Sequence, residues 1–580
     1  MASLRPIPGY SGVTVEHDVP ARMRDGVTLY ADVYRPATPG RYPVILFRHP
    51  YDKAPVASLT YAHAAWYARH GYAVVNQDVR GRHASEGRWY PFEHEADDGE
   101  ETVEWAARLP GANGRVGMLG FSYYGATQLQ AALRRPPSLT CVCPGMTGSQ
   151  YFDGWTYNQG AFALAFAASW ATFLAMGEAK RRGDAVATAA MHRAFLDGMS
   201  LYGGLPLRDY PPLAGNDLAP YFRDWLEHST YDDYWQRFSI DTDYSRIDVP
   251  ALHVAGWYDI FLSGTVANFQ GLRRGAGSPA SRGRQKLLVG PWYHIPWTPM
   301  PGAVHLGLQA SNQAVNEWQI RWFDQFLKDE DTGVLDAPVT LFVMGDNAWR
   351  DEKDWPPPGT RFVDYYLHSG GLANSSTGDG RLDREPPGNE PSDLFSYDPL
   401  FPVPSAGGHS CCFPNVAPMG MEPQGLPEAF NSVLVYTSPP LSRDLEVTGP
   451  VTATLYAVSS AVDTDFTVKL CDVWPDGRSF NIQEGIVRAR YRESLSRPTL
   501  ITPDEIYKYR IDLGPTANVF KAGHRIRVDV SSSDFPQWDR NLNTGGALGE
   551  ENLARAVVAN QVLLHEGRHP SRITLPIVER

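Results

Sequence analysis

Residues 116–126 read VGMLGFSYYGA, and the rest of the chain can be understood from this stretch. Its first four residues form a short apolar run that suits a buried strand, and the residues from Tyr123 onward favour a helix. Ser122 therefore lies on a tight turn, and Gly120 leaves room for the bend. Such a turn exposes the serine oxygen above a sheet, while the helix N-terminus aims backbone N–H groups at a reacting carbonyl. The pattern is typical of a nucleophile elbow, although its second glycine, Gly125, stands one position later than usual.

The size and charge of the chain exclude several classes of protein. With 580 residues it is long enough for roughly three or four domains of about 150 residues each. A net charge of -13 argues against nucleic acid or an anionic membrane as partner. The first residues lack the apolar core of a signal peptide, and the Ala- and Phe-rich run 161–176 is too short to span a bilayer. We expect a cytoplasmic, soluble enzyme.

The cysteines are few, and their spacing does not suggest a structural role. There are five of them: Cys141, Cys143, Cys411, Cys412 and Cys471. An odd number at these spacings fits neither a disulfide framework nor a zinc site. We expect reduced, buried thiols, no metal and no cofactor, and the sequence leaves open whether Cys411 and Cys412 matter.

The order of the elements predicts three domains. Short apolar strands alternate with helices in residues 1–144 and again in 241–354, which predicts an α/β core of the α/β-hydrolase type. Residues 145–240 interrupt this alternation with Ala-rich helices and Pro-rich loops, so they are expected to form a helical cap inserted above the sheet. Residues 355–580 contain strands with period-two alternation separated by Gly, Pro and Ser turns. This last part is expected to be a jelly-roll β-sandwich.

Four predicted strands of the core each end next to a residue whose side chain can take part in catalysis. These residues are Tyr51, Ser122, Asp259 and His294. Ligands of an open α/β sheet bind at the carboxyl ends of its strands, so the four side chains should share one rim. The order Ser, acid, His is that of the α/β-hydrolases, and the interval from Asp259 to His294 fits one crossover helix plus one strand.

These residues form a candidate catalytic triad. His294 would take the proton of Ser122 and return it to the leaving group, while Asp259 would hold the imidazole tautomer. The oxyanion hole would combine the backbone N–H of Tyr123 with the hydroxyl of Tyr51. Taken singly, each residue has a structural alternative: a turn serine, a loop cap, a rim histidine or a tyrosine that covers the sheet. Four other histidines could compete as base, but none follows a strand after the acid: His49, His83, His94 and His253.

A set of motifs spread over nearly the whole chain resembles a known group of serine hydrolases. The motifs are HPYDK at 49–53, QDVRGRHASEG at 77–87, GFSYYG at 120–125, GWYD at 256–259, GPWYH at 290–294, VMGDNAWR at 343–350 and TDFTVKLCDVWPDGRS at 464–479. In this order they resemble the family of cocaine esterases, Xaa-Pro dipeptidyl-peptidases and α-amino-acid ester hydrolases, and most of all its cocaine esterase branch. The resemblance implies the same three domains, the same triad and Tyr51 as oxyanion donor.

The resemblance also implies an aromatic acyl pocket. In the cocaine esterase branch, two tryptophans of the insertion and a phenylalanine after the triad aspartate wall this pocket, and Trp155, Trp170 and Phe261 fall at those places here. Flat aromatic or other apolar acyl groups would then be preferred. Plain packing of an aromatic-rich cap remains the alternative.

One departure from the family pattern bears on the substrate. The amino-acid ester hydrolases resemble one another in using carboxylates near the triad to hold an ammonium group, whereas this chain has Phe261 and Leu262 after the triad aspartate. An apolar pair cannot offset the cost of desolvating an ammonium, which argues against α-amino substrates. Asp153 is a candidate anionic residue for a free N-terminus, without further support.

The sequence therefore predicts a serine carboxylesterase that acts on a small-molecule ester with an apolar or aromatic acyl group through an acyl-serine intermediate. The alternative within enzymes is a Xaa-Pro dipeptidyl-peptidase or an amidase using the same triad. From another class, the C-terminal domain could make the chain a carbohydrate-binding or assembly protein with a vestigial hydrolase. A homodimer through an exposed strand face is possible on this pattern.

Overall fold

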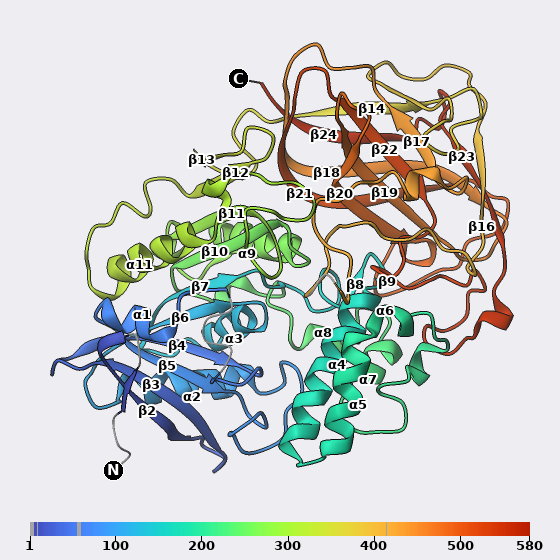
Figure 1. Ribbon diagram of the computed structural model, residues 1–580. Coiled ribbons are helices and arrows are strands. Elements are labelled where there is room, and N and C mark those ends of the chain that lie inside the picture. The colour runs from blue at the N-terminus through green and yellow to red at the C-terminus, as the bar shows by residue number, and fades with distance from the viewer. Residues whose placement is uncertain (1–4, 8–9, 55–59, 413–414, 580) are drawn as a thin grey trace.

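The computed structural model describes residues 5–7, 10–54, 60–412 and 415–579. Figure 1 shows three regions: a sheet covered by helices, a bundle of helices beside it, and a domain made of strands that contains the C-terminus. The domain made of strands packs against residues 255–344 of the α/β region. The fold class expected from the sequence is confirmed.

The α/β core contains a mostly parallel sheet with the strand order β1-β2-β3-β5-β4-β6-β7-β10-β11-β12-β13. From β5 through β12 in this order, neighbouring strands are parallel, and antiparallel strands close both edges. The strands are β1 (Arg5–Ile7), β2 (Tyr10–Arg22), β3 (Thr28–Pro36), β4 (Tyr42–His49), β5 (Ala73–Asp78), β6 (Ala112–Phe121), β7 (Leu139–Gly145), β10 (Ala251–Tyr258), β11 (Gln285–Tyr293), β12 (Val339–Val343) and β13 (Ala348–Glu352).

Helices cover both faces of this sheet because its central strands are apolar on both sides. In β4, Val44 and Leu46 belong to one buried cluster, and Ile45 and Phe47 belong to another on the opposite face. The helices are α1 (Ala64–Arg69), α2 (Glu95–Ala107), α3 (Tyr123–Ala132), α9 (Leu262–Gly275), α10 (Pro279–Arg282) and α11 (Gln313–Leu327). The first turn of α2 contains Glu95, Asp97 and Asp98, where the helix dipole favours carboxylates.

The inserted region is helical and lies beside the core (Figure 1). It contains α4 (Leu164–Arg181), α5 (Ala185–Leu196), α6 (Gly198–Leu201), α7 (Tyr221–Glu227) and α8 (Asp233–Gln236), with the short pair β8 (Tyr157–Asn158) and β9 (Ala161–Phe162) before them. Large aromatic side chains fill its interior and continue into the rim of the core sheet. The insertion therefore contributes side chains to the same place as the carboxyl ends of the core strands.

The C-terminal domain consists of strands joined by loops and short 3₁₀ turns within the described residues. Its strands are β14 (Arg361–His368), β15 (Arg381–Asp383), β16 (Asp393–Tyr397), β17 (Leu434–Thr437), β18 (Leu445–Ser459), β19 (Asp465–Val473), β20 (Ser479–Arg488), β21 (Tyr507–Phe520), β22 (Arg525–Ser531), β23 (Ala559–Leu564) and β24 (Arg572–Val578). Side chains along β18 alternate between buried and partly buried, as period-two patterning predicts. Because one hydrophobic cluster contains residues of β10, β11 and these strands, the two domains share a packed interface.

Candidate active site

Ser122 stands on a sharp turn between β6 and α3. Its backbone has φ 63° and ψ -130°, a strained conformation for a residue with a side chain, and Gly120 before it has φ 145°. The N–H of Ser122 donates to the carbonyl of Gly145 at 2.9 Å. A strained, pinned serine at the start of a helix is the geometry of a nucleophile elbow.

The late position of the second glycine has a local cause. A Cβ at Gly125 would lie 2.7 Å from the Cβ of Thr147 and 2.9 Å from the carbonyl oxygen of Gly145. Gly125 therefore allows α3 to approach the end of β7, the strand next to β6 in the sheet. The glycine is needed where the helix touches the neighbouring strand, which in this chain is three residues after the serine.

Asp259 and His294 come from adjacent parallel strands. Asp259 follows β10 and His294 follows β11, and Gly256 pairs with Gly290 in the register of these strands. The imidazole Nδ1 of His294 lies 2.6 Å from Oδ1 of Asp259, and both side chains are buried. With Nδ1 engaged by the carboxylate, Nε2 is the nitrogen left to exchange a proton.

His294 also lies beside the elbow. Its ring centroid is 5.5 Å from that of Phe121, the residue before Ser122. The structure thus brings together the three residues that the sequence singled out from three separate strands. Their catalytic roles remain predictions from this geometry.

Tyr51 lies at the same rim, after β4. Its hydroxyl interacts with the side chain of Ser122 and accepts a 3.0 Å hydrogen bond from the indole N–H of Trp170. Burial raises the pKa of Tyr51 to about 12, so the hydroxyl keeps its proton at neutral pH. A neutral phenol next to the nucleophile can donate to an oxyanion.

Tyr123 is placed to provide the second donor through its backbone. It is the first residue of α3, where backbone N–H groups have no partner inside the helix. Its phenol is occupied elsewhere: it donates to Oε1 of Glu95 at 2.9 Å and accepts the N–H of Phe92 at 2.9 Å. The side chain therefore anchors the helix start and leaves the backbone N–H for the site.

The other histidines considered as bases are held in other contacts. Burial lowers the pKa of His49 to about 3, and its Nδ1 accepts the N–H of Tyr51 while Nε2 faces Asn76. Burial likewise lowers the pKa of His83 and of His253 to about 4 each. His94 is the residue before α2. None of them has the carboxylate partner at 2.6 Å that His294 has.

The three predicted pocket residues form one aromatic wall. Trp155 and Phe261 stack with ring centroids 3.9 Å apart, and Trp155 meets Trp170 edge to face at 5.9 Å. The ring of Phe261 in turn lies perpendicular to that of His294, with the centroids 5.1 Å apart. The wall therefore begins at the triad histidine, as an acyl pocket requires.

Sequence reasoning missed two aromatic residues of this wall. Phe166 stacks on Trp170 with ring centroids 5.7 Å apart, and Trp225 also stacks on Trp170, with ring centroids 5.8 Å apart. Both stand in the Ala-rich or aromatic helices of the cap, where spacing alone does not separate a pocket residue from a core residue.

A buried ion pair from the C-terminal domain also reaches the triad. His409 has Nδ1 2.8 Å from Oε1 of Glu484 and Nε2 2.7 Å from the carbonyl oxygen of Trp257, two residues before Asp259. Because both ring nitrogens face acceptors, the ring is held as an imidazolium. Burial alone would lower the pKa of His409, but the charge of Glu484 and these hydrogen bonds raise it above its ordinary value. The positive ring near Asp259 partly balances the triad carboxylate, and no local pattern around His409 predicts this contact.

The expectation of five reduced thiols is wrong for two of them. Cys411 and Cys412 form a disulfide, whereas Cys141, Cys143 and Cys471 are free and buried. Spacing rules for disulfides and zinc sites concern cysteines that link distant segments, and adjacent cysteines link none. The pair packs against the aromatic cluster of the cap and lies beside His294.

Asp153 does not lie in the aromatic wall. Its carboxylate accepts the N–H of Gln159 at 2.8 Å, and burial raises its pKa to about 6. It lines a polar cavity of about 300 Å³ that also reaches Asp259 and Glu484.

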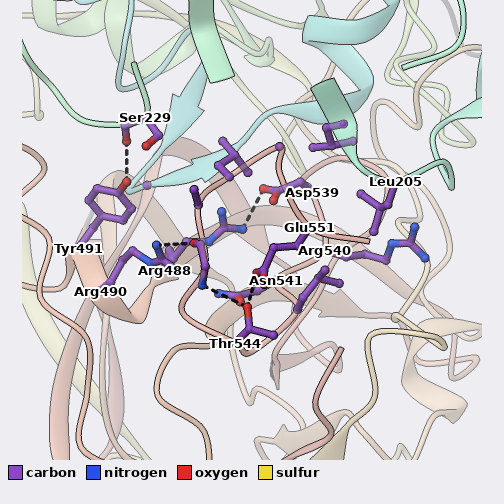
Figure 2. A pocket seen from close by; sticks show the side chains of 17 residues that line it. Leu205, Ser229, Arg488, Arg490, Tyr491, Asp539, Arg540, Asn541, Thr544 and Glu551 are labelled. Atoms are coloured by element: carbon purple, nitrogen blue, oxygen red, sulfur yellow. Dashed lines mark hydrogen bonds and ion pairs between the residues drawn. The ribbon is translucent and has the colours of Figure 1, made fainter. Parts of the chain in front are cut away.

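A second cavity, of about 50 Å³, lies where the cap meets the C-terminal domain (Figure 2). There Tyr491 of the C-terminal domain donates to the carbonyl of Ser229 of the cap at 2.6 Å.

A Ser, Asp and His arrangement at the carboxyl rim of such a sheet defines a serine hydrolase of the α/β-hydrolase class. The comparisons agree. Residues 25–296 match the model of the X-Pro dipeptidyl-peptidase (S15 family), and residues 332–574 match the X-Pro dipeptidyl-peptidase C-terminal non-catalytic domain. The cocaine esterase of Rhodococcus sp. (strain MB1 Bresler) is 39% identical over 98% of this chain and 99% of its own length. The chain belongs to this family of serine hydrolases, together with the cocaine esterase.

Solved structures show the same fold over the full length. An aminopeptidase from the marine sediment archaeon Thaumarchaeota archaeon has a TM-score of 0.83 at 25% identity, covering 100% of this chain and 98% of that chain. An α-amino acid ester hydrolase has a TM-score of 0.82 at 26% identity, covering 99% and 98%. In the part of the chain that the structure describes, no helix is long and apolar enough to cross a membrane.

Proposed function

We propose that this serine hydrolase is a carboxylesterase for small-molecule esters with an apolar or aromatic acyl group. The observation that carries the proposal is the stack of Trp155 on Phe261, whose ring lies perpendicular to that of His294 at a centroid distance of 5.1 Å. An acyl ring bound to this wall would bury apolar area beside the nucleophile. The full-length similarity to a cocaine esterase supports the same substrate class.

The geometry suits acyl transfer in two steps. Nε2 of His294 takes the proton of Ser122 as its oxygen attacks the ester carbonyl, and Asp259 stabilises the resulting imidazolium. The carbonyl oxygen becomes an oxyanion, to which the Tyr51 hydroxyl and the Tyr123 N–H donate. His294 then gives its proton to the leaving alkoxide, and the acyl group stays on Ser122.

Deacylation repeats the same steps with water. His294 deprotonates a water molecule that attacks the acyl-serine, and the same two donors hold the second oxyanion. The proton then returns to Ser122 as the carboxylic acid leaves. The two half-reactions balance as hydrolysis of one ester by one water molecule to one acid and one alcohol.

A carboxylate for an ammonium group is not part of the wall. Phe261 and Leu262 are buried apolar residues after the triad aspartate, and Asp153 is held by its own loop. Both features favour the ester over the dipeptidyl-peptidase or amidase alternative. The alternative keeps a distant sequence match to Xaa-Pro dipeptidyl-peptidases, at 24% identity over 38% of the chain.

The test compares hydrolysis of an aryl benzoate with hydrolysis of Ala-Pro-anilide. We expect cleavage of the benzoate by the wild type, loss of this cleavage by several orders of magnitude in Ser122→Ala, and little cleavage of the anilide. Ser169→Ala is the matched control, because this buried hydroxyl bonds to the carbonyl of Phe166 within its own helix. Preferential cleavage of the anilide would refute the ester proposal, and an active Ser122→Ala would refute the triad.

We further propose a cytoplasmic location, a jelly-roll topology of the C-terminal domain and a possible homodimer. The net charge of -13 supports a small-molecule substrate over nucleic acid or an anionic membrane.

Leu394 is 61% exposed on β16, which ends the strand order of the C-terminal sheet, and an exposed apolar edge favours pairing with a second copy. Sedimentation of the wild type against Leu394→Lys tests the dimer.

A further inference from the structure

The Cys411–Cys412 pair lies against the catalytic histidine and has no part in the mechanism above. The Sγ atoms of both cysteines and one ring nitrogen of His294 all lie within 4.8 Å of one another. Cys411 is fully buried and Cys412 is partly exposed. Two sulfurs and an imidazole nitrogen are the ligand atoms that zinc and cadmium prefer.

The arrangement around His294 suits a metal ligand. Its Nδ1 is engaged by Asp259 at 2.6 Å, so Nε2 is the nitrogen available on the ring. A histidine that ligates a metal commonly has its other nitrogen bound to a carboxylate, which fixes the tautomer and raises the basicity of the ligating nitrogen. The triad therefore already contains the outer carboxylate that a metal-binding histidine needs.

We propose that reduction of the Cys411–Cys412 disulfide creates an inhibitory site for a thiophilic divalent cation, Zn²⁺ or Cd²⁺, formed by the two cysteine sulfurs and Nε2 of His294. The inhibitory part of this inference rests on the proposed hydrolase function, since it is the base of that reaction that the metal would occupy. The disulfide form is the metal-free, active form. Reduction alone leaves the base free, and the cation then removes it.

The chemistry balances with a thiol or a phosphine as reductant. Two electrons from the reductant break the S–S bond, and two protons convert the sulfurs of Cys411 and Cys412 into thiols. If the reductant is a small thiol, two of its molecules form a disulfide. If it is a phosphine, it becomes a phosphine oxide with the oxygen of water. Binding of the cation releases the two thiol protons and forms two metal–sulfur bonds and one metal–nitrogen bond. Nε2 can then no longer accept the proton of Ser122.

The charge and the spacing also suit this site. Two thiolates, one neutral imidazole and a divalent cation sum to zero charge, which an apolar surrounding tolerates, and Cys411 packs in the cluster that contains Trp155 and Phe261. Bonds of about 2.3 Å to sulfur and 2.0 to 2.1 Å to nitrogen place tetrahedral ligand atoms roughly 3.5 to 3.8 Å apart. Once the S–S bond is broken, the two sulfurs must move apart from their bonding distance to this spacing, while the ring nitrogen of His294 already lies within 4.8 Å of both. A water molecule or the Ser122 hydroxyl can take the fourth position.

A second group of possible ligands lies in the C-terminal domain and provides a control. Glu428, Cys471 and Asp529 are buried with ligand atoms equally close together. Arg527 forms an ion pair with Glu428, and the Cys471 thiol donates to Asp529 at 3.7 Å. Because the guanidinium of Arg527 already neutralises Glu428 and the group contains only one sulfur, it is the weaker site for a soft metal.

The experiment titrates the full-length protein with Cd²⁺ with and without a phosphine reductant. The first readout is the ultraviolet charge-transfer absorption of Cd–thiolate bonds, and the second is hydrolysis of an aryl benzoate. We expect no band and no inhibition for the untreated protein. The reduced protein should bind one Cd²⁺ per chain with a thiolate band and lose activity in parallel, and a chelator should restore the activity.

Variants identify the ligands. In Cys411→Ala/Cys412→Ala the band should disappear and Cd²⁺ should not change the rate relative to that of the same variant without metal. Cys471→Ala should behave as the wild type. Asp259→Asn, read by absorption alone, should weaken Cd²⁺ binding about 10- to 100-fold because the outer carboxylate is lost. If the double variant does not fold, Cys412→Ser should show the same loss of the one-to-one band in reduced protein.

The outcomes separate this inference from the proposed function. Inhibition that is equal with and without reductant, or that persists in the double variant, overturns the site. A thiolate band that follows Cys471 instead of Cys411 and Cys412 also overturns it. If no ester is cleaved, the proposed function fails, while the absorption titration still decides whether the metal site exists.

Discussion

The indole N–H of Trp170 donates a 3.0 Å hydrogen bond to the hydroxyl of Tyr51. Trp170 belongs to α4 of the cap, whereas Tyr51 follows β4 of the core. Because the phenol oxygen accepts this bond, its own proton is free to point toward Ser122 and the oxyanion position. The cap therefore orients the hydroxyl of a core residue, in addition to contributing Trp155 and Trp170 to the proposed acyl pocket.

Two variants separate the donor from the residue that orients it. Tyr51→Phe removes the oxyanion donor and should lower kcat about 100- to 1000-fold. Trp170→Phe keeps an aromatic wall and removes one neutral hydrogen bond, so kcat should fall roughly 2- to 10-fold. Steady-state kinetics with an aryl benzoate measures both. Equal losses in the two variants would contradict the division of roles.

Phe261 should set the preference for an aromatic acyl group. Its stack on Trp155 is lost in Phe261→Ala, and the missing ring removes about 1.5 to 3 kcal/mol of apolar contact, or roughly 10- to 100-fold. We expect kcat/KM for the benzoate to fall by this factor relative to that for the acetate of the same phenol. Phe395→Ala, a buried ring of the C-terminal domain, controls for general loss of stability. An unchanged benzoate-to-acetate ratio in Phe261→Ala would assign the ring to packing alone.

Gly125 should be intolerant of a side chain. The Cβ of Gly125→Ala would meet the carbonyl oxygen of Gly145 at 2.9 Å, and the resulting strain should cost about 1 to 3 kcal/mol and displace the elbow. We expect a lower melting temperature and a lower kcat per folded molecule. Gly203→Ala is the control, because nothing lies within 4 Å of its added Cβ. Normal kcat in Gly125→Ala would show that the helix can shift without moving Ser122.

The His409–Glu484 pair should make stability depend on pH. Although burial alone would raise it, the charge of His409 lowers the pKa of Glu484 to about 2, and Glu484 raises that of His409. The carboxylate contributes stability above its unfolded pKa of about 4.3, and this contribution is lost as the pH falls toward 2. The imidazolium contributes fully below about 6.5, and its contribution is lost as the pH rises through the raised pKa.

Glu484→Gln should therefore lower the melting temperature most between about pH 4.5 and 6.5, where both groups are charged in the wild type. The difference between the two proteins should shrink at alkaline pH, where His409 is neutral. Thermal unfolding followed by circular dichroism across this range measures the difference. A constant difference from pH 5 to pH 9 would mean that the pair contributes through packing and not through charge.

Local patterns were enough for the class of fold and for the order of the candidate residues. The apolar run before Ser122, the helix after it and the strands before Asp259 and His294 are properties of neighbouring residues, and the strand–turn–helix alternation places all of them at one rim. The predicted domain ranges and the catalytic roles stay predictions. The motifs that resemble the family were confirmed by the full-length match.

Contacts between distant segments lay beyond such patterns. His409 reaches the strand before Asp259 from 152 positions away, and the Cys411–Cys412 pair reaches His294 from the same loop. No period or local propensity records which loop of the C-terminal domain folds back onto the core. The disulfide was missed for a different reason, because it joins adjacent cysteines, whereas the spacing rules concern cysteines that link distant segments. The proposed metal ligands were missed because the third of them, His294, is remote from the two cysteines in the sequence.

The sequence by itself determined the strand–turn–helix at Ser122, the order of serine, acid and histidine, and the apolar pair after the acid, because these depend on residues close together in the chain. Only the tertiary structure decided that Trp170 orients Tyr51, that Trp155 stacks on Phe261, and that two cysteines lie beside His294. These relationships arise when the cap and the C-terminal domain pack onto the core. Burial then strengthens the hydrogen bonds between the packed side chains and shifts their pKa values away from those found in water.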